Sequence, residues 1–172
     1  VFQVYDDFSL RESAWNIWLG KLKELNNAEK VEIIEKGPIR YSVRIKYTYK
    51  EKGKNDSTLF KEIRLYSHFP IIEFKVNLDW QTPHKMLKVA FPLNLHAEEA
   101  TYNIPYGTIQ RKIPTSFEAD ATDRAKWEVS ALKWIDYTDK EKNYGVSLLS
   151  ESKYGFDVKD NTIRMSLLRT PD

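Results

Sequence analysis

The chain has 172 residues, 41% hydrophobic and 30% charged. This balance excludes a disordered chain, because the apolar side chains suffice to offset the entropy of ordering. No apolar run approaches the roughly 18 residues that a membrane-spanning helix needs, and a net charge of +2 is too small to indicate a nucleic-acid or membrane partner. The sequence contains no cysteine, which excludes disulfides, a thiol nucleophile and a cysteine-ligated zinc site.

The N-terminal segment carries two signals. Val1 to Ser9 has no basic n-region, so no secretory leader is expected. Farther along, a set of mostly apolar residues recurs with the spacing of a helix. Its members are Ala14, Ile17, Trp18, Lys21, Leu22 and Leu25. This spacing predicts at most a short helix near residues 14–26, with an ordered loop as the alternative.

The clearest pattern is an alternation of period two from Ile39 to Lys50, where apolar or aromatic residues alternate with basic or hydroxyl residues. Successive side chains of a strand point to opposite faces, so the pattern predicts a half-buried strand. The charged residues from Lys52 to Asp56 indicate a hairpin loop, and Leu59–Tyr66 is the expected return strand. After a break at Pro70, a second alternation predicts a strand from Ile72 to Trp80.

The rest of the chain also favours strands. Met86–Leu95 is more uniformly apolar and is expected to be buried on both faces. Other candidate strands are Val31–Glu35, Tyr102–Tyr106, Trp127–Trp134, Tyr144–Leu149 and Thr162–Leu168. No repeat, low-complexity linker or shift in composition divides the chain. The sequence therefore predicts an all-β fold, an antiparallel β-sandwich forming a single domain over residues 1–172.

The alternation also predicts which side chains form the core. A slip of one residue in the strand register would bury Arg40, Arg44 and Lys75 in place of their apolar neighbours. The expected core residues are Tyr41, Val43, Ile45, Phe74, Val76, Leu78, Val89 and Phe91.

No self-contained active site is recognisable among these residues. The sequence has no nucleophile elbow, dinucleotide-binding motif or phosphate loop. His96 and Glu98 would share a strand face, but two ligands do not make a metal site, so a surface pair is preferred. Asp6-Asp7 and Glu98-Glu99 are interpreted as solvated surface, because neighbouring strand residues point in opposite directions. The basic and aromatic residues of Ile39–Lys50 also suit a nucleic-acid platform, although an ordinary sandwich strand is preferred.

One stretch resembles a known family. Asp79–Pro92 begins Asp-Trp and continues as His-Lys-Met-Leu-Lys-Val-Ala-Phe-Pro, and it resembles a segment of glycoside hydrolase family 38, the α-mannosidases. Further matches follow in the family's order at Ser13–Ile17, Glu35–Arg40, Ala100–Tyr102, Tyr106–Gly107, Ala125–Val129, Trp134–Asp136, Lys153–Asp157 and Leu167–Arg169. The resemblance is to the β-rich C-terminal half of the subgroup with bacterial, archaeal and cytosolic members.

The resemblance implies a supersandwich like that of the galactose mutarotases, packed against a catalytic barrel that lies outside this chain. Family 38 members are retaining exo-α-mannosidases that use a divalent metal, usually zinc. Their catalytic carboxylates and metal ligands lie in the barrel, so no catalytic residue, metal ligand or cofactor is expected here, and the chain alone should be inactive. The expected partners are the parent's own catalytic domain and, through the parent, α-mannosides. A cytoplasmic location is expected from the subgroup.

Four residues form the substrate-binding site that the resemblance implies. The arginine ending the family's Leu-Leu-Arg strand looks like the domain's main reach toward the sugar pocket, and it corresponds to Arg169. A guanidinium offers several fixed donors to sugar hydroxyls or to a carboxylate. Glu151, Lys153 and Tyr154 are expected at the same rim. The alternative for Arg169 is a strand-end arginine paired with a surface acid.

Other interpretations stay open. A non-catalytic carbohydrate-binding or interaction module is the alternative to a supporting domain. Trp80, Trp127 and Trp134 are interpreted as core or interdomain packing, with stacking on sugar as the alternative, and His84 as a hydrogen-bonded structural residue. A face that packs on a barrel would leave an apolar patch on this chain, through which the free domain would form a homo-oligomer.

Overall fold

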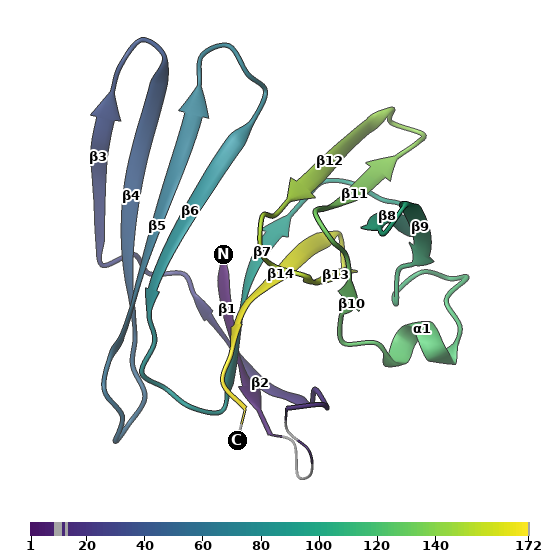
Figure 1. The fold of residues 1–172 in the computed structure, drawn as a ribbon, viewed down its shortest axis with the longest axis horizontal. Helices are drawn as coiled ribbons and strands as arrows, with labels where there is room; N and C mark the ends of the chain where they lie inside the picture. The colour runs from purple at the N-terminus through teal and green to yellow at the C-terminus, as the bar shows by residue number, and fades with distance from the viewer. Residues whose placement is uncertain (9–11, 13, 172) are drawn as a thin grey trace. The chain divides into compact units, whose positions relative to one another are not determined.

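The computed structural model describes residues 1–8, 12 and 14–171. Ser9, the last residue of the segment examined for a leader, and Ser13, the first residue of the family-like segment Ser13–Ile17, lie outside the described residues. The chain groups into two compact units, residues 1–24 with 84–172 and residues 25–83. Nearly all regular structure is antiparallel β, which confirms the predicted fold class (Figure 1). The single domain over residues 1–172 stays a prediction.

Residues 25–83 form a four-stranded antiparallel sheet in the order β3-β4-β5-β6 (Figure 1). Its strands are β3 (Lys30–Lys36), β4 (Arg40–Tyr49), β5 (Ser57–Tyr66) and β6 (Ile72–Asp79). The β4–β5 loop contains Gly53, whose φ of 78° lies in the left-handed region that favours glycine. The predicted hairpin and the strands on either side of it are therefore confirmed.

The predicted core is only partly right. The register places Val43, Ile63 and Phe74 in one row, so the phase of the alternation is correct. Of the eight expected core residues, Val89 is fully buried at 4% exposure, whereas Tyr41 is 50% and Phe74 37% exposed. Half-buried are Val43, Ile45, Val76, Leu78 and Phe91. The apolar face of the β3–β6 sheet is fully buried only toward Tyr47, Tyr49 and Leu59.

Residues 1–24 with 84–172 contain two sheets, in the orders β10-β13-β14-β7-β1-β2 and β12-β11-β8-β9 (Figure 1). The strands of the first are β1 (Phe2–Asp7), β2 (Leu19–Leu25), β7 (Lys85–Pro92), β10 (Val129–Ser130), β13 (Gly155–Lys159) and β14 (Thr162–Arg169). Those of the second are β8 (Glu99–Ile104), β9 (Gly107–Lys112), β11 (Trp134–Asp139) and β12 (Tyr144–Leu149). The two sheets pack through one core, to which Phe156 and Ile163 contribute from the first and Tyr102, Ile135 and Tyr137 from the second. This unit is the β-sandwich.

The helical spacing near residues 14–26 does not produce a helix. Leu19–Leu25 forms β2, an edge strand whose side chains are mostly exposed. An edge strand with solvent on both sides needs no strict alternation, so the spacing of three between its leucines is compatible with a strand. The one helix among the described residues is α1 (Ala121–Ala125), capped by Asp120, whose carboxylate accepts from the Asp123 amide at 2.8 Å.

Candidate functional site

A β-bulge sets the direction of Arg169. The pairing of β14 with β7 shifts between Ser166 and Leu168, so that Leu168 lies opposite Leu87 and Arg169 opposite Met86. Bulges re-aim side chains at strand ends. Here the extra residue, Leu167, moves Arg169 onto the same face as Asp7, because β1 pairs with the other edge of β7.

Arg169 is held by a buried carboxylate. Its Nε lies 2.5 Å from Asp7 Oδ2 and its Nη2 lies 3.1 Å from Asp7 Oδ1, a two-point contact in which both nitrogens donate. Nη2 also donates to the carbonyl oxygen of Asn16. Asp7 is only 3% exposed, so its interpretation as solvated surface is wrong. None of these three bonds involves Nη1 of Arg169.

The other three candidate residues lie in the connection from β12 to β13. Lys133 Nζ donates to the carbonyl of Glu151 at 3.1 Å, and the amide of Lys153 donates to Ser150 Oγ at 3.0 Å. Tyr154 is 54% exposed. Because β13 runs antiparallel to β14, the start of β13 and the end of β14 lie at the same end of the sheet. The fold thus brings the four residues to one sheet end. The bonds of Arg169 go to Asp7, which the sequence analysis assigned to solvated surface, and to the backbone of Asn16.

The polar face of the same sheet carries a buried charge network. Lys88 is 1% exposed, and its Nζ lies 2.7 Å from Asp157 Oδ2 and 3.3 Å from Glu128 Oε2. Arg164 Nη1 contacts the other oxygen of Asp157 at 2.8 Å, and Ser166 Oγ donates to Glu128. The two positive charges of Lys88 and Arg164 are matched by the two carboxylates of Asp157 and Glu128. Charged groups are stable inside a protein only when they are paired in this way. The network therefore fixes strands β7, β13 and β14 together.

Gly155 makes room for this network. A Cβ added at Gly155 would lie 2.7 Å from Glu128 Oε1, closer than van der Waals contact permits. Any larger residue at this position would displace the Glu128 carboxylate from Lys88. The glycine of the family-like Lys-Tyr-Gly motif is therefore explained by close approach within this chain.

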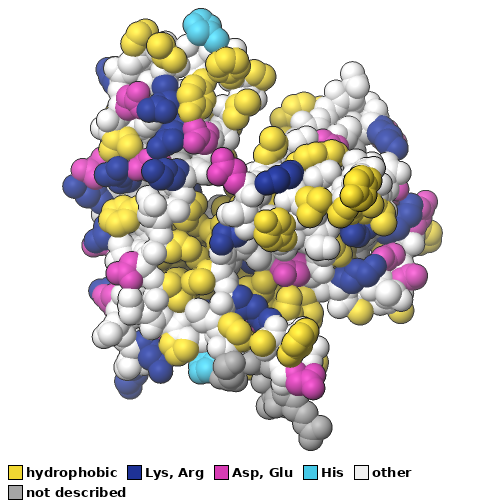
Figure 2. All heavy atoms as spheres, in the orientation of Figure 1, with side chains coloured by type: hydrophobic (Ala, Val, Ile, Leu, Met, Phe, Trp, Pro, Cys, Tyr) yellow, Lys and Arg dark blue, Asp and Glu magenta, His cyan; other side chains and the backbone are white. Residues whose placement is uncertain are grey.

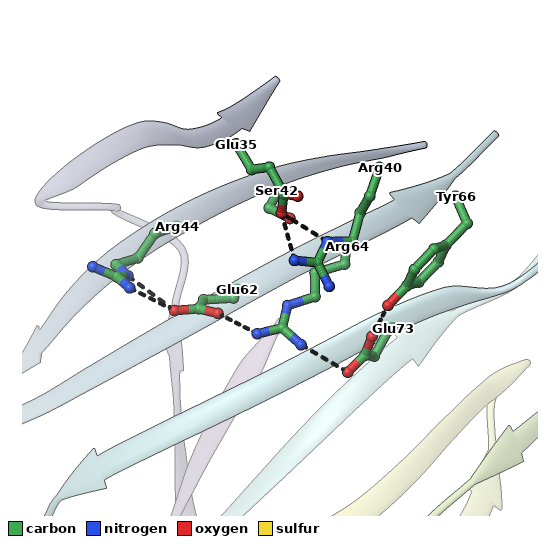
Figure 3. A network of polar contacts seen from close by, with 8 residues as sticks. All are labelled: Glu35, Arg40, Ser42, Arg44, Glu62, Arg64, Tyr66 and Glu73. Carbon is green, nitrogen blue, oxygen red and sulfur yellow. Dashed lines mark hydrogen bonds and ion pairs between the residues drawn. The ribbon is translucent and has the colours of Figure 1, made fainter. Parts of the chain in front are cut away.

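A second network crosses the polar face of the β3–β6 sheet (Figure 3). Glu62, 4% exposed, accepts from Arg44 Nη2 at 2.7 Å and from Arg64 Nη2 at 2.9 Å. Arg64 also donates to Glu73 at 3.0 Å. The members drawn in Figure 3 are Glu35, Arg40, Ser42, Arg44, Glu62, Arg64, Tyr66 and Glu73. The three arginines are thus engaged with three glutamates of the same sheet.

These contacts lower the pKa of the carboxyl groups. Hydrogen bonds from Arg44 and then Arg64 hold the pKa of Glu62 below its ordinary value of 4.5. The Tyr66 hydroxyl, which donates to Glu73, is the main cause of the lowered pKa of Glu73. Arg40 has the same effect on Glu35. The network therefore favours the ionised form of each glutamate in the folded chain.

The histidines do not converge on a metal site. His96 Nδ1 lies 3.1 Å from Asn161 Nδ2, and Glu98 accepts from Ser116 Oγ, so the two residues have separate partners. Within residues 1–8, 12 and 14–171, no group of three or more His, Asp and Glu side chains is placed to hold a metal ion. In the same part of the chain, no helix has the length and apolarity needed to cross a bilayer.

Residues 1–172 match the family model of the glycosyl hydrolases family 38 C-terminal domain, and the chain belongs to this family. The resemblance drawn from the Asp79–Pro92 segment and its companions is confirmed.

Curated relatives are α-mannosidases much longer than this chain. Alpha-mannosidase G of Dictyostelium discoideum is 34% identical over 170 residues, which cover 98% of this chain and 15% of that protein. Alpha-mannosidase 2C1 of Mus musculus is 33% identical over 174 residues, with 99% of this chain and 16% of that protein covered. The α-mannosidase of Saccharomyces cerevisiae is 31% identical, with the same coverage. The chain thus spans 15–16% of the length of these relatives.

Solved structures share the fold. The crystal structure of an α-mannosidase from Enterococcus faecalis V583 superposes with a TM-score of 0.84 at 14% identity, covering 98% of this chain and 22% of that one. A glycosyl hydrolase family 38 protein from Enterococcus faecalis gives a TM-score of 0.80 at 15% identity. At this identity the likeness concerns the arrangement of strands alone.

Proposed function

We propose that this chain is the supporting β domain of a retaining exo-α-mannosidase that hydrolyses terminal α-mannosyl residues. The relatives named α-mannosidase contain a segment like this chain as about one sixth of their length. The reaction needs two carboxylates flanking the glycosidic bond, one as nucleophile and one as acid and base. We assign these carboxylates, and the ligands of a divalent metal such as zinc, to a catalytic domain outside residues 1–172.

The observation that carries the proposal is an uncovered apolar surface on the β3–β6 sheet. Tyr41, Leu65 and Ile72 form one row across it, and they are 50%, 50% and 56% exposed. We call the following set the apolar sheet end: Ile33, Tyr41, Leu65, Ile72 and Phe74. In Figure 2, hydrophobic side chains gather at the end of this sheet that is uppermost in Figure 1. Contiguous exposed apolar patches mark interaction surfaces.

The remainder of the larger enzyme is the occupant that we assign to the apolar sheet end. About five sixths of each relative lies outside the matched segment, and interdomain contacts bury roughly 600–1,500 Å². Arg169, Glu151, Lys153 and Tyr154 would then form part of the rim of the sugar pocket. We place the enzyme in the cytoplasm, in keeping with the subgroup that the sequence resembles.

The test is Leu65→Lys in the full-length enzyme, with Phe117→Lys as the control. Phe117 is 95% exposed and lies in residues 84–172, so its change also adds a charge at an exposed hydrophobic position. We expect Leu65→Lys alone to lower the melting temperature and kcat/KM for an α-mannoside and to speed proteolysis between domains. Unchanged values for both variants would contradict the proposal. A dimer that Leu65→Lys converts into a fully active monomer would assign the surface to a second copy.

A further inference from the structure

The β12-β11-β8-β9 sheet has a hollow on the face turned away from its core. Ile135 and Tyr137 of β11 are buried in the core at 0% and 1% exposure, so the residues that alternate with them, Trp134 and Asp136, point to the opposite face. The hollow has a volume of about 390 Å³ and is lined by Thr101, Trp134, Asp136, Ser147 and Leu149. We call this set the Trp134 hollow.

The lining residues form two neighbouring rows across three strands. Trp134 lies opposite Leu149, and Asp136 lies between Thr101 and Ser147. The first row is apolar, with Leu149 72% exposed, and the second is polar. Small-molecule sites combine an apolar wall with a few convergent polar groups, and these two rows supply both on an open surface.

Asp136 is oriented by hydroxyl groups and not by a cation. Its Oδ1 accepts from Thr138 Oγ1 at 2.6 Å, and its Oδ2 accepts from Ser147 Oγ at 2.7 Å. Each carboxylate oxygen keeps a second acceptor position. Among the described residues Asp136 has no ion pair with a lysine or arginine. The carboxylate is therefore fixed in place while its charge stays available to donors from a ligand.

The chemistry of the two rows matches a sugar ring. One face of a pyranose presents C–H groups, which pack on the broad apolar surface of an indole, while its rim presents O–H donors. Neighbouring hydroxyls of one ring can each donate to one oxygen of a carboxylate, and hydrogen bonds to an ionised acceptor are the strong ones. We propose that the Trp134 hollow binds one hexopyranose unit, with the ring against Trp134 and two adjacent hydroxyls on Asp136.

The inference rests on the geometry of β8, β11 and β12 and does not depend on the proposed catalytic partner.

The test uses the full-length protein labelled with 5-fluorotryptophan and followed by ¹⁹F NMR. The Trp134 signal is assigned with Trp134→Phe, and methyl α-mannoside is titrated. We expect a saturable shift of that signal with a Kd on the order of 1 mM, and at least tenfold weaker binding in Asp136→Ala. Trp15, 86% exposed, is the internal control and should not shift. The melting temperatures of Trp134→Phe and Asp136→Ala are measured to check that weaker binding does not result from unfolding.

Several results would overturn the site. They are the absence of any Trp134 shift, a Trp134 signal shielded from solvent in the full-length protein, and an unchanged Kd in Asp136→Ala. An equal response to glycerol, or stronger binding of an alkylammonium ion, would replace the sugar with a general polyol or cation contact. The readout is a shift at one residue and not turnover, so it stays informative if the protein proves to have no mannosidase activity.

Discussion

Arg169 and Asp7 are 162 residues apart in the sequence and form a two-point ion pair, with Nε and Nη2 of the arginine donating to the two carboxylate oxygens. The carboxylate is almost fully buried. The pair joins the end of β14 to the end of β1, strands that both border β7. Arg169 therefore contributes to the fold of this chain, and its contact with substrate stays a prediction.

Removing the acid should destabilise the fold. Asp7→Ala leaves the Arg169 guanidinium without its partner in a partly buried place, and breaking a buried pair costs about 3–5 kcal/mol. Because Arg169 keeps some exposure, we expect a loss at the lower end, measured by urea unfolding. The double variant Asp7→Ala/Arg169→Ala should recover part of it. A loss under about 0.5 kcal/mol, typical of surface pairs, would contradict this account.

The substrate role of Arg169 is tested separately in the full-length enzyme. If Arg169 contacts the sugar, Arg169→Ala should lower kcat/KM by the equivalent of about 1.5–3 kcal/mol, the scale of a hydrogen bond to a charged group. Asp7→Ala is the matched control, since it breaks the same ion pair but keeps the guanidinium. Equal losses in the two variants would assign Arg169 to support of the fold alone.

Gly155→Ala should loosen the Lys88 network. The added methyl group would lie 2.7 Å from Glu128 Oε1 and would push the carboxylate away. We expect a loss of about 1–3 kcal/mol in the free energy of unfolding. Gly107→Ala is the control, because a Cβ there meets nothing within 4 Å. Equal stability of the two variants would show that Glu128 adapts without cost.

Stability should fall as the solution is acidified. The pKa of Glu62, Glu73 and Glu35 is lowered in the folded chain relative to the ordinary 4.5. Their contribution is therefore complete above that value and is lost as pH falls through the lower folded pKa. Urea unfolding from pH 7 down to about 3 measures the decline, which should be shallower in Arg44→Met. A pH-independent free energy would refute the assignment.

The chain alone should not hydrolyse α-mannosides. We expect no turnover of a nitrophenyl α-mannoside by purified residues 1–172, because the catalytic carboxylates are assigned to another domain. Circular dichroism should first verify that the preparation is folded. Measurable turnover that survives removal of contaminating glycosidases would place catalysis within this chain.

The alternation in the sequence was enough to predict the β4–β5 hairpin and the phase of its faces, because a strand with one wet face repeats with period two. It could not predict β2, whose exposed edge position removes that constraint. The sequence also could not predict that Asp7 and Glu62 are buried, because the burial of each depends on an arginine from another strand. Trp134 does not lie in the sandwich core, because only alternate residues of β11 face it, and its interpretation as interdomain packing stays a prediction.

The order of strands along the chain has a consequence for synthesis. Strands β3 to β6 are consecutive and pair only with neighbours in sequence, so their sheet can close as soon as residue 83 has left the ribosome. Strand β1 is made first but pairs with β7, as in Phe2 with Val89, and the sandwich needs β14 as well. Local pairings form faster than distant ones. We therefore expect the β3–β6 sheet to fold on the nascent chain while β1 is still unpaired, because β7 has not yet been synthesised.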